Sequence, residues 1–275
     1  MPPARLAPAG GPDPYSAGMP TNLDDSQLAA ELATAAGRLL LGVRTEYADA
    51  DPAERKKQGD RRSHEFLMAE LAAARPDDAV LSEEGADDPV RLTAERVWIV
   101  DPLDGTREFS ELDRVDWAVH VALWQSGELV AGAVALPAQN MTLGTPKVDL
   151  APPVGGSPRL VVSRTRPPEL VGSLARALAG RLVPMGSAGA KAMAIVLGEA
   201  DAYVHGGGQY EWDSAAPVAV ARAAGLHTSR LDGGALRYNQ PNPLLPDLVV
   251  CRPELAEALL AAIAKVSDEG GDAVG

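Results

Sequence analysis

Acidic side chains occupy three separate places where the backbone is expected to turn. Glu83 and Glu84 directly follow a short apolar run, Asp101 and Asp104 lie at the end of a longer one, and Asp213 begins a helical segment. Oxygen ligands of this kind suit Mg²⁺. Two Mg²⁺ ions about 3.5–4 Å apart can activate a water and stabilise the leaving oxygen of an in-line phosphoryl displacement. Each segment alone is also compatible with a turn, a helix cap or a solvated loop, so this hypothesis requires the three to meet in space.

Residues 101–106, with the sequence Asp-Pro-Leu-Asp-Gly-Thr, are the most informative of these segments. Pro102 fixes its own φ and lacks an N–H donor, which helps the chain to leave the strand and lets the two aspartates converge. The same turn exposes the Leu103 carbonyl as a further oxygen ligand. Gly105 lets the backbone approach a ligand closely, and Thr106 opens a helix whose free N–H groups suit a phosphate.

Alternating helical and extended patterns predict the elements that must carry these residues. Residues 21–152 are predicted to form an α+β half with a hairpin over 115–136, and residues 158–275 an α/β half in which strands and helices alternate. Clustered Pro and Gly separate the two halves. Helices are predicted after Asp24 and over residues 60–74, 168–179, 189–197, 213–224 and 253–265, and strands over residues 79–81, 97–100, 160–162, 201–205 and 247–251.

The composition is that of an acidic globular protein. The 275 residues carry 25 Lys and Arg against 38 Asp and Glu, and the formal net charge of −13 disfavours nucleic acid and anionic membranes as partners. The single cysteine, Cys251, excludes an internal disulfide and a cysteine-based zinc site. With so little cysteine, a reducing cytoplasm is the expected compartment. No apolar run is long enough to span a membrane. Residues 1–20 are predicted to be a disordered tail, because Pro, Gly and Ala dominate them.

The motifs at residues 81–85, 98–106 and 212–216 together resemble the three signatures of one superfamily, in the same order and at similar separations. It is the lithium-sensitive, magnesium-dependent phosphomonoesterase superfamily, which contains inositol monophosphatases, fructose-1,6-bisphosphatases and bisphosphate nucleotidases. The continuation over residues 107–109 looks most like bacterial 3′(2′),5′-bisphosphate nucleotidases of the CysQ type, and the whole chain looks like their actinobacterial branch. The resemblance implies a layered α-β-α-β-α sugar-phosphatase fold, Mg²⁺ as the cofactor and inhibition by Li⁺.

The resemblance also implies which residues bind the metal ions, of which we expect two or three. Glu83, Asp101 and the carbonyl of Leu103 would hold one Mg²⁺. Asp101, Asp104 and Asp213 would hold the second.

Catalytic roles follow from the same resemblance. Asp60 falls where the family has an acidic residue serving a third, water-rich metal site, although Lys57 stands where the family often has Thr. Thr106, together with Glu83 or Asp60, would orient or deprotonate the attacking water. The backbone N–H groups of Gly105 and Thr106 would bind the transferred phosphate. We expect direct in-line attack by this water and no covalent intermediate, since no Ser, Cys or His is placed to be a nucleophile.

A nucleoside bisphosphate carries a second phosphate, which needs cationic cover away from the metals. Arg164, Arg166 and Lys191 lie on segments that the family places around that pocket, and Arg can bind phosphate through two hydrogen bonds. Each is equally compatible with a solvated surface cation, and Arg166 stands where the nucleotidases often have His. The other predicted substrate contacts are Gly105, Thr106, Arg107, Ser163, Ser187 and Asp213.

Substrate choice depends on a position that has no side chain here. Inositol monophosphatases usually place a Glu seven residues before the last metal Asp, where it contacts inositol hydroxyls, and in this chain that residue is Gly206. The absence of this Glu disfavours inositol phosphate as the substrate. Trp117 and Tyr210 are each compatible with a border of a base pocket or with a core position. His64 and His120 are interpreted as packing or surface groups.

The resemblance therefore predicts a Mg²⁺-dependent phosphatase that converts 3′-phosphoadenosine 5′-phosphate into AMP and phosphate in sulfate assimilation, with 3′-phosphoadenylyl sulfate as a further candidate substrate. A broader inositol monophosphatase or fructose-1,6-bisphosphatase is the first alternative. A non-catalytic nucleotide sensor is the second, and the complete set of acidic ligands argues against it. We expect a small nucleoside bisphosphate as the partner, no nucleic acid and no membrane, and we allow for a homodimer.

Overall fold

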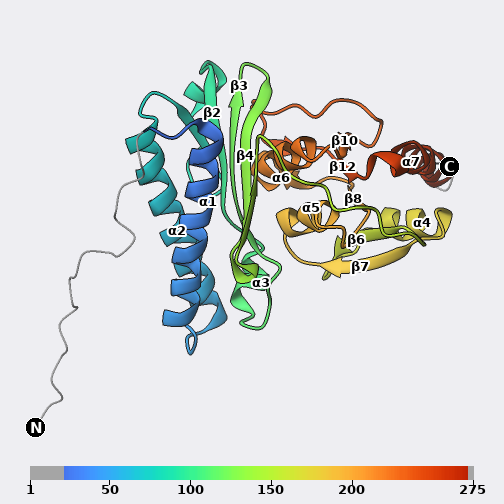
Figure 1. The fold of residues 1–275 in the computed structure, drawn as a ribbon, viewed down its shortest axis with the longest axis horizontal. Helices are drawn as coiled ribbons and strands as arrows, with labels where there is room; N and C mark the ends of the chain where they lie inside the picture. The colour runs from blue at the N-terminus through green and yellow to red at the C-terminus, as the bar shows by residue number, and fades with distance from the viewer. Residues whose placement is uncertain (1–21, 272–275) are drawn as a thin grey trace, which may run out of the picture.

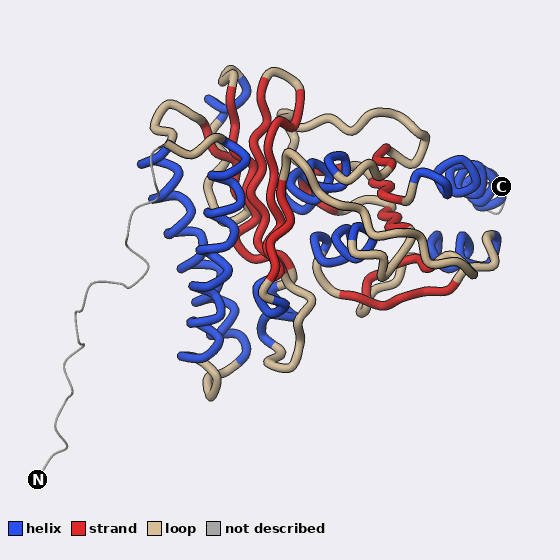
Figure 2. Tube along the Cα trace, viewed as in Figure 1, coloured by secondary structure: helices blue, strands red, loops and turns tan. Residues whose placement is uncertain are grey.

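The computed structural model describes residues 22–271, in which two mixed β-sheets alternate with layers of helices (Figures 1 and 2). The predicted tail over residues 1–20 lies outside the described residues. The α-helices are α1 (Asp25–Glu46), α2 (Pro52–Ala74), α3 (Thr106–Ser110), α4 (Glu169–Ala177), α5 (Ala188–Val196), α6 (Glu211–Ala223) and α7 (Ala256–Gly271). Short 3₁₀ helices are η1 (Pro89–Leu92), η2 (Pro137–Gln139) and η3 (Pro253–Leu255).

The first sheet has the strand order β1-β2-β3-β4-β5, in which β1 and β2 are parallel and the other neighbours antiparallel. Along β2, Trp98 and Val100 pack on the side of α1 and α2, whereas Val97 and Ile99 pack on the opposite side. Because both faces of β2 are covered, its sequence is a nearly continuous apolar run. The strands of this sheet are β1 (Ala79–Ser82), β2 (Arg96–Asp104), β3 (Ala118–Gln125), β4 (Glu128–Leu136) and β5 (Met141–Gly144).

The second sheet has the order β10-β12-β8-β6-β7, with β6 parallel to β7 and β8 and the remaining pairs antiparallel. A separate two-stranded ribbon pairs β9, which lies immediately before α6 in the chain, with β11, which follows α6. These strands are β6 (Arg159–Ser163), β7 (Arg181–Met185), β8 (Ala202–His205), β9 (Gln209–Tyr210), β10 (His227–Ser229), β11 (Leu244–Leu245) and β12 (Leu248–Cys251).

Five layers result, and they confirm the predicted α-β-α-β-α fold (Figure 1). Helices α1 and α2 cover one face of the first sheet, α5 and α6 fill the space between the sheets, and α4 and α7 cover the far face of the second sheet. The middle layer is rich in alanine, and every residue of α5 is buried. Small side chains let α5 and α6 approach both sheets closely, which places their first turns near the end of β2.

Two features differ from the sequence prediction. Helix α2 begins at Pro52, earlier than the predicted start at residue 60, with Asp51 as its N-cap. Its first turns are polar and therefore lack an apolar pattern. They are held instead by the buried Arg55, whose guanidinium donates to backbone carbonyls of Tyr47 and Ser110, among others. The short strands β5, β9, β10 and β11 were not predicted, because two to four residues carry too weak a pattern.

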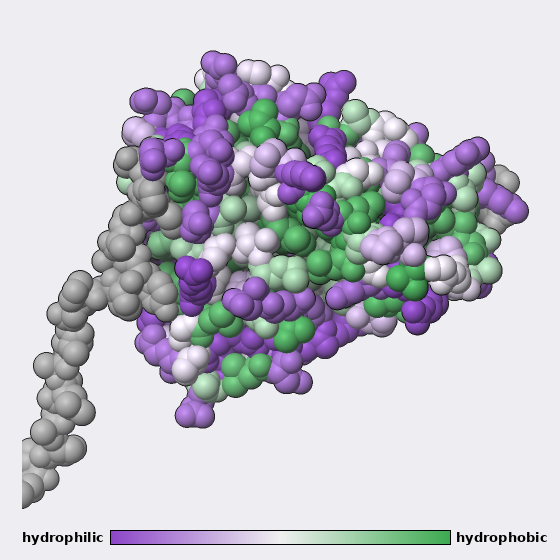
Figure 3. All heavy atoms as spheres, viewed as in Figure 1, coloured by the Kyte–Doolittle hydropathy of each residue, from purple (hydrophilic) through white to green (hydrophobic). Residues whose placement is uncertain are grey.

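The surface matches the acidic composition. Figure 3 shows hydrophilic residues spread over the face in view, with small hydrophobic patches between them. Within residues 22–271, none of the helices combines the length and the apolar character that crossing a bilayer requires.

Candidate metal centre

The end of β2 is shaped by an irregularity in its pairing with β3. Asp101 pairs with His120 and Asp104 pairs with Ala118, and the register shifts between these two pairs. The Asp101 carboxylate accepts a hydrogen bond from the Leu103 amide at 3.0 Å within this irregularity. Gly105 follows with φ +82°, a left-handed conformation that favours glycine, and then α3 begins at Thr106. The strand therefore continues through Asp104, beyond its predicted end at residue 100, and Pro102 and Leu103 lie in an irregularity within β2 and not in a turn that leaves it.

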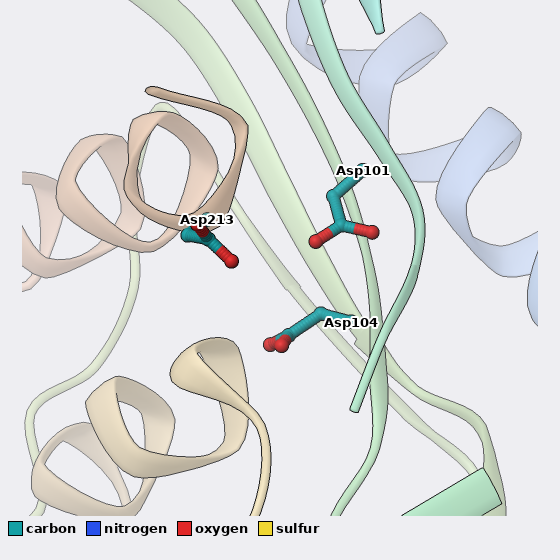
Figure 4. Close-up of side chains that lie close together, drawn as sticks. All are labelled: Asp101, Asp104 and Asp213. Carbon is teal, nitrogen blue, oxygen red and sulfur yellow. The ribbon is translucent and has the colours of Figure 1, made fainter. Parts of the chain in front are cut away.

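Three of the predicted metal ligands meet in space. Ligand oxygens of Asp101, Asp104 and Asp213 all lie within 4.8 Å of one another. Figure 4 shows the three carboxylates pointing toward a common centre, two from β2 and one from the first turn of α6. Asp101 is fully buried, and its Oδ2 has no hydrogen-bond partner within the described residues. An unpartnered buried carboxylate oxygen among hard oxygen donors is suited to a divalent cation such as Mg²⁺.

Asp104 is the most firmly held of the three. Its Oδ2 accepts hydrogen bonds from the Ser187 hydroxyl and the Gly189 amide (2.7 Å), and its Oδ1 accepts one from the Ala188 amide (3.1 Å). The carboxylate therefore caps the N-terminus of α5, where free N–H groups favour an anion. Burial acts to raise the pKa of Asp104, but the nearby His120 and Lys191 and the Ser187 hydroxyl outweigh it and hold that pKa below its ordinary value.

Asp213 is held by its own helix start. Its Oδ2 accepts a hydrogen bond from the Tyr210 amide at 2.6 Å, so the third residue of α6 reaches back to the N-cap backbone. Burial and the charge of Asp104 raise the pKa of Asp213 to about 6. Burial, followed by the charges of Glu83, Asp104 and Asp213, raises the pKa of Asp101 well above its ordinary value. A bound cation would relieve this repulsion and keep the carboxylates ionised.

Glu83 and Asp60 form an outer acidic rim. Glu83 lies after β1 and its residue surface is exposed, although its carboxyl group is shielded from water. That shielding, together with the charges of Asp213, Asp104 and Glu84, raises the pKa of Glu83 to about 7 against a lowering effect of Asp101. Asp60 on α2 has its pKa raised to about 7 by burial and by Glu84. The group of ligand atoms within 4.8 Å of one another, among the described residues, contains Asp101, Asp104 and Asp213 but neither Glu83 nor Asp60.

The interpretation of His120 as a packing or surface group is incomplete. This side chain is fully buried, and its Nε2 lies 3.2 Å from Asp104 Oδ2. Its Nδ1 lies 3.1 Å from the carbonyl oxygen of Trp212 and 4.0 Å from Asp101 Oδ2. The signal in the sequence is a single polar residue within an apolar strand, and the β2–β3 register then places it opposite Asp101.

The predicted cations for a second phosphate mostly have protein partners. Arg164 forms ion pairs with Glu108 (2.9 Å) and Glu111 (3.0 Å), and Arg107 lies 3.5 Å from Glu111. Lys191 is buried, and its Nζ donates to the backbone carbonyls of Gly186 (3.2 Å) and Ser187 (2.8 Å). Arg166 is different. It is exposed, its backbone amide donates to the Ser163 hydroxyl, and no ion pair of its side chain is present among residues 22–271.

The two aromatic candidates for a base pocket, Trp117 and Tyr210, differ in their exposure to solvent. Trp117 is fully buried and packs edge-on against Phe109 with ring centroids 5.1 Å apart, so it is a core residue. Tyr210 is 42% exposed and stacks on Trp212 at 4.7 Å with an interplanar angle of 5°. One aromatic surface thus remains open to solvent three residues before Asp213 in the chain.

Comparison with known proteins agrees with this geometry. The family model described as "Inositol monophosphatase family" matches residues 24–151 and 156–268. The 3′-phosphoadenosine 5′-phosphate phosphatase of Mycobacterium leprae is 53% identical over 257 residues, which covers 89% of this chain and 95% of that protein. The 3′(2′),5′-bisphosphate nucleotidase CysQ of Shigella flexneri is 34% identical over 193 residues, which covers 65% of this chain and 77% of that protein.

This chain also superimposes on solved structures of the same family. The CysQ structure from Bacteroides thetaiotaomicron, described as a bacterial member of the inositol monophosphatase family, superimposes with a TM-score of 0.68 at 29% identity and covers 82% of this chain and 96% of that one. On the family match and the 53% identity over nearly the full length, the chain belongs to the inositol monophosphatase family.

Proposed function

We propose that this protein is a Mg²⁺-dependent phosphatase that removes the 3′-phosphate of 3′-phosphoadenosine 5′-phosphate to give AMP and phosphate, a reaction that would clear a by-product of sulfate assimilation. The observation that carries the proposal is the convergence of Asp101, Asp104 and Asp213 on one centre. It occurs in a chain 53% identical to a phosphatase named for this substrate. A cytoplasmic location and a homodimer remain predictions.

Bound Mg²⁺ would activate a water and offset the negative charge that develops on the leaving oxygen. Glu83, Asp101 and the Leu103 carbonyl are proposed to hold one ion, and Asp101, Asp104 and Asp213 a second. Asp60 is proposed to serve a third ion.

The reacting groups are held by the turn that follows β2. Thr106, with Glu83 or Asp60, is proposed to orient the attacking water and take its proton. The amides of Gly105 and Thr106 are proposed to bind the transferred phosphate. A Cβ at Gly105 would lie 3.1 Å from Ser187 Cβ, so a side chain there would disturb the serine that holds Asp104.

Substrate preference is proposed to depend on residues near the start of α6. Tyr210 presents an exposed aromatic surface on which an adenine could stack. Gly206 offers no carboxylate to inositol hydroxyls, yet an added Cβ there would meet nothing closer than Leu170 Cδ2 at 3.8 Å. The protein therefore has room for a side chain at this position, and packing does not require glycine there. The absence of a carboxylate at residue 206 is consistent with a substrate other than inositol phosphate.

The test compares kcat/KM for 3′-phosphoadenosine 5′-phosphate, inositol 1-phosphate and fructose 1,6-bisphosphate on one preparation. We expect the adenosine bisphosphate to be preferred, and Gly206→Glu to move the ratio toward inositol phosphate. A wild-type preference for either sugar phosphate would refute the substrate assignment. Binding of the nucleotide without release of phosphate would instead support a sensor.

A further inference from the structure

His120 lies near the start of β3, between the two segments that carry Asp104 and Asp213. Its imidazole is fully buried. A carbonyl oxygen can only accept a hydrogen bond, so Nδ1 donates to the Trp212 carbonyl at 3.1 Å. Nε2 then faces the other way and lies 3.2 Å from Asp104 Oδ2, at ion-pair distance, and it forms no hydrogen bond within the described residues. One ring therefore contacts both the end of β2 and the first turn of α6.

The first turn of α5 leaves room for this ring. A Cβ added at Gly189 would lie 2.1 Å from His120 Nε2, and its three nearest heavy atoms all belong to that imidazole. The Gly189 amide also donates to Asp104 Oδ2 at 2.7 Å. Glycine at this position thus lets the helix amide and the imidazole approach the same carboxylate oxygen.

These contacts fix one oxygen of Asp104 and leave the other available. Oδ2 accepts hydrogen bonds from the Ser187 hydroxyl and the Gly189 amide and lies 3.2 Å from His120 Nε2. Among the described residues, Oδ1 accepts one hydrogen bond, from the Ala188 amide at 3.1 Å. Oδ1 therefore retains lone-pair capacity for a cation. A histidine that only filled space would not need its two nitrogens aimed at polar groups of two ligand-bearing segments.

We propose that His120 is a positioning residue of the metal centre, which ties Asp104 to the first turn of α6 and so sets the separation between Asp104 and Asp213. This inference rests on the proposed ligand set. Contacts of this kind outside the ligands typically change metal affinity by about 10- to 100-fold.

The test measures equilibrium binding of Mg²⁺ to the metal-free full-length protein by calorimetry, with the thermal midpoint of the same metal-free protein recorded beside it. In His120→Asn, the amide nitrogen can replace Nδ1 but cannot reach Asp104. In His120→Gln, the amide nitrogen can reach the position of Nε2. We expect His120→Asn to raise the Kd for Mg²⁺ by about tenfold or more, and His120→Gln to recover part of that loss.

A double-mutant cycle with Gly189→Ala adds a second readout. Alone, this substitution should weaken Mg²⁺ binding because the new methyl group displaces the imidazole. In the His120→Asn background it should cause little further loss, because the space beside Gly189 has been vacated. Additive losses would show that Gly189 acts independently of the ring.

Asp104→Asn serves as the control for the ligand set. If Asp104→Asn binds Mg²⁺ as tightly as the wild type, the proposed ligands are wrong. If Asp104→Asn loses binding while His120→Asn retains it, only the role of His120 is refuted. Equal losses in His120→Asn and His120→Gln, in parallel with lower thermal midpoints, would assign the ring to packing alone and also refute the proposal.

Discussion

The inner and outer parts of the metal centre are built differently. In the inner part, Asp104 and Asp213 accept hydrogen bonds from helix starts and from Ser187, and Asp104 has a pKa below its ordinary value. In the outer rim, Glu83 and Asp60 lie near other acids, and the pKa of each is raised to about 7. The inner part therefore holds its geometry through the protein itself.

The ionisation of the rim carboxyl groups depends on whether a cation is bound. These groups lose ionisation near neutral pH unless a cation offsets their repulsion. We infer that the inner ligands set where an ion binds, and that the rim, together with Asp101 and Asp213, whose pKa values are also raised, makes binding depend on pH. Variants of the two parts distinguish these roles.

Removing an inner ligand should have the largest effect. We expect Asp104→Asn to lower kcat by about two decades or more, because a carboxylate proposed to bind the second ion is lost. Phosphate release under saturating Mg²⁺ measures this. Asp77→Asn, at the opposite end of β1 from Glu83, is the matched control and should leave kcat unchanged. Unchanged activity in Asp104→Asn would contradict the two-metal mechanism.

Ser187 distinguishes a positioning role from a substrate contact. Because its hydroxyl donates to Asp104, we expect Ser187→Ala to raise the Kd for Mg²⁺ by about tenfold or more. Metal titrations of the substrate-free protein measure this. Ser163→Ala removes another predicted substrate contact and should leave that Kd unchanged. A higher KM for the nucleotide with an unaltered metal Kd in Ser187→Ala would favour the substrate contact instead.

The rim should make the metal-free protein less stable as pH rises. A carboxyl whose pKa is raised on folding binds more protons in the native state than in the unfolded one, so stability falls with pH between its ordinary value near 4 and the raised value near 7. Thermal unfolding in EDTA at pH 5 and pH 8 measures this.

Mg²⁺ should act in the opposite direction, because binding requires deprotonated carboxylates. We expect its affinity to rise about tenfold between pH 6 and pH 8. The combined variant Asp60→Asn and Glu83→Gln should flatten the stability profile of the metal-free protein in part, since Asp101 and Asp213 keep their raised pKa values. Metal-free stability that instead increases across this window would show that the rim acids are ionised in the absence of a cation.

Tyr210 should have the smallest effect. We expect Tyr210→Ala to raise KM for 3′-phosphoadenosine 5′-phosphate roughly five- to tenfold, because base stacking is lost, with little change in Mg²⁺ affinity. Tyr210→Phe retains the ring and serves as the control. An equal rise in KM for inositol phosphate would place the effect at the helix cap of Asp213 and not at the base.

Much of the fold could be predicted because apolar runs and turn residues are local signals. The predicted hairpin over 115–136 corresponds to β3 and β4, and the motif at 101–106 correctly ends a buried strand. The polar start of α2 was missed because Arg55 is satisfied by carbonyls of other segments, which a local pattern does not reveal.

The sequence by itself determined the helices and strands with strong local patterns, because apolar periodicity and turn residues are local, and its three motifs identified the family and through it the layered fold. That Asp101, Asp104 and Asp213 converge was implied by the family resemblance and is seen in the tertiary structure. Tertiary structure alone decided how the carboxylates are held. Asp104 is bound by Ser187, Ala188 and Gly189, more than 80 positions later in the chain, and by His120 on the neighbouring strand. Contacts between distant segments depend on packing and on strand register, and local sequence patterns do not reveal either.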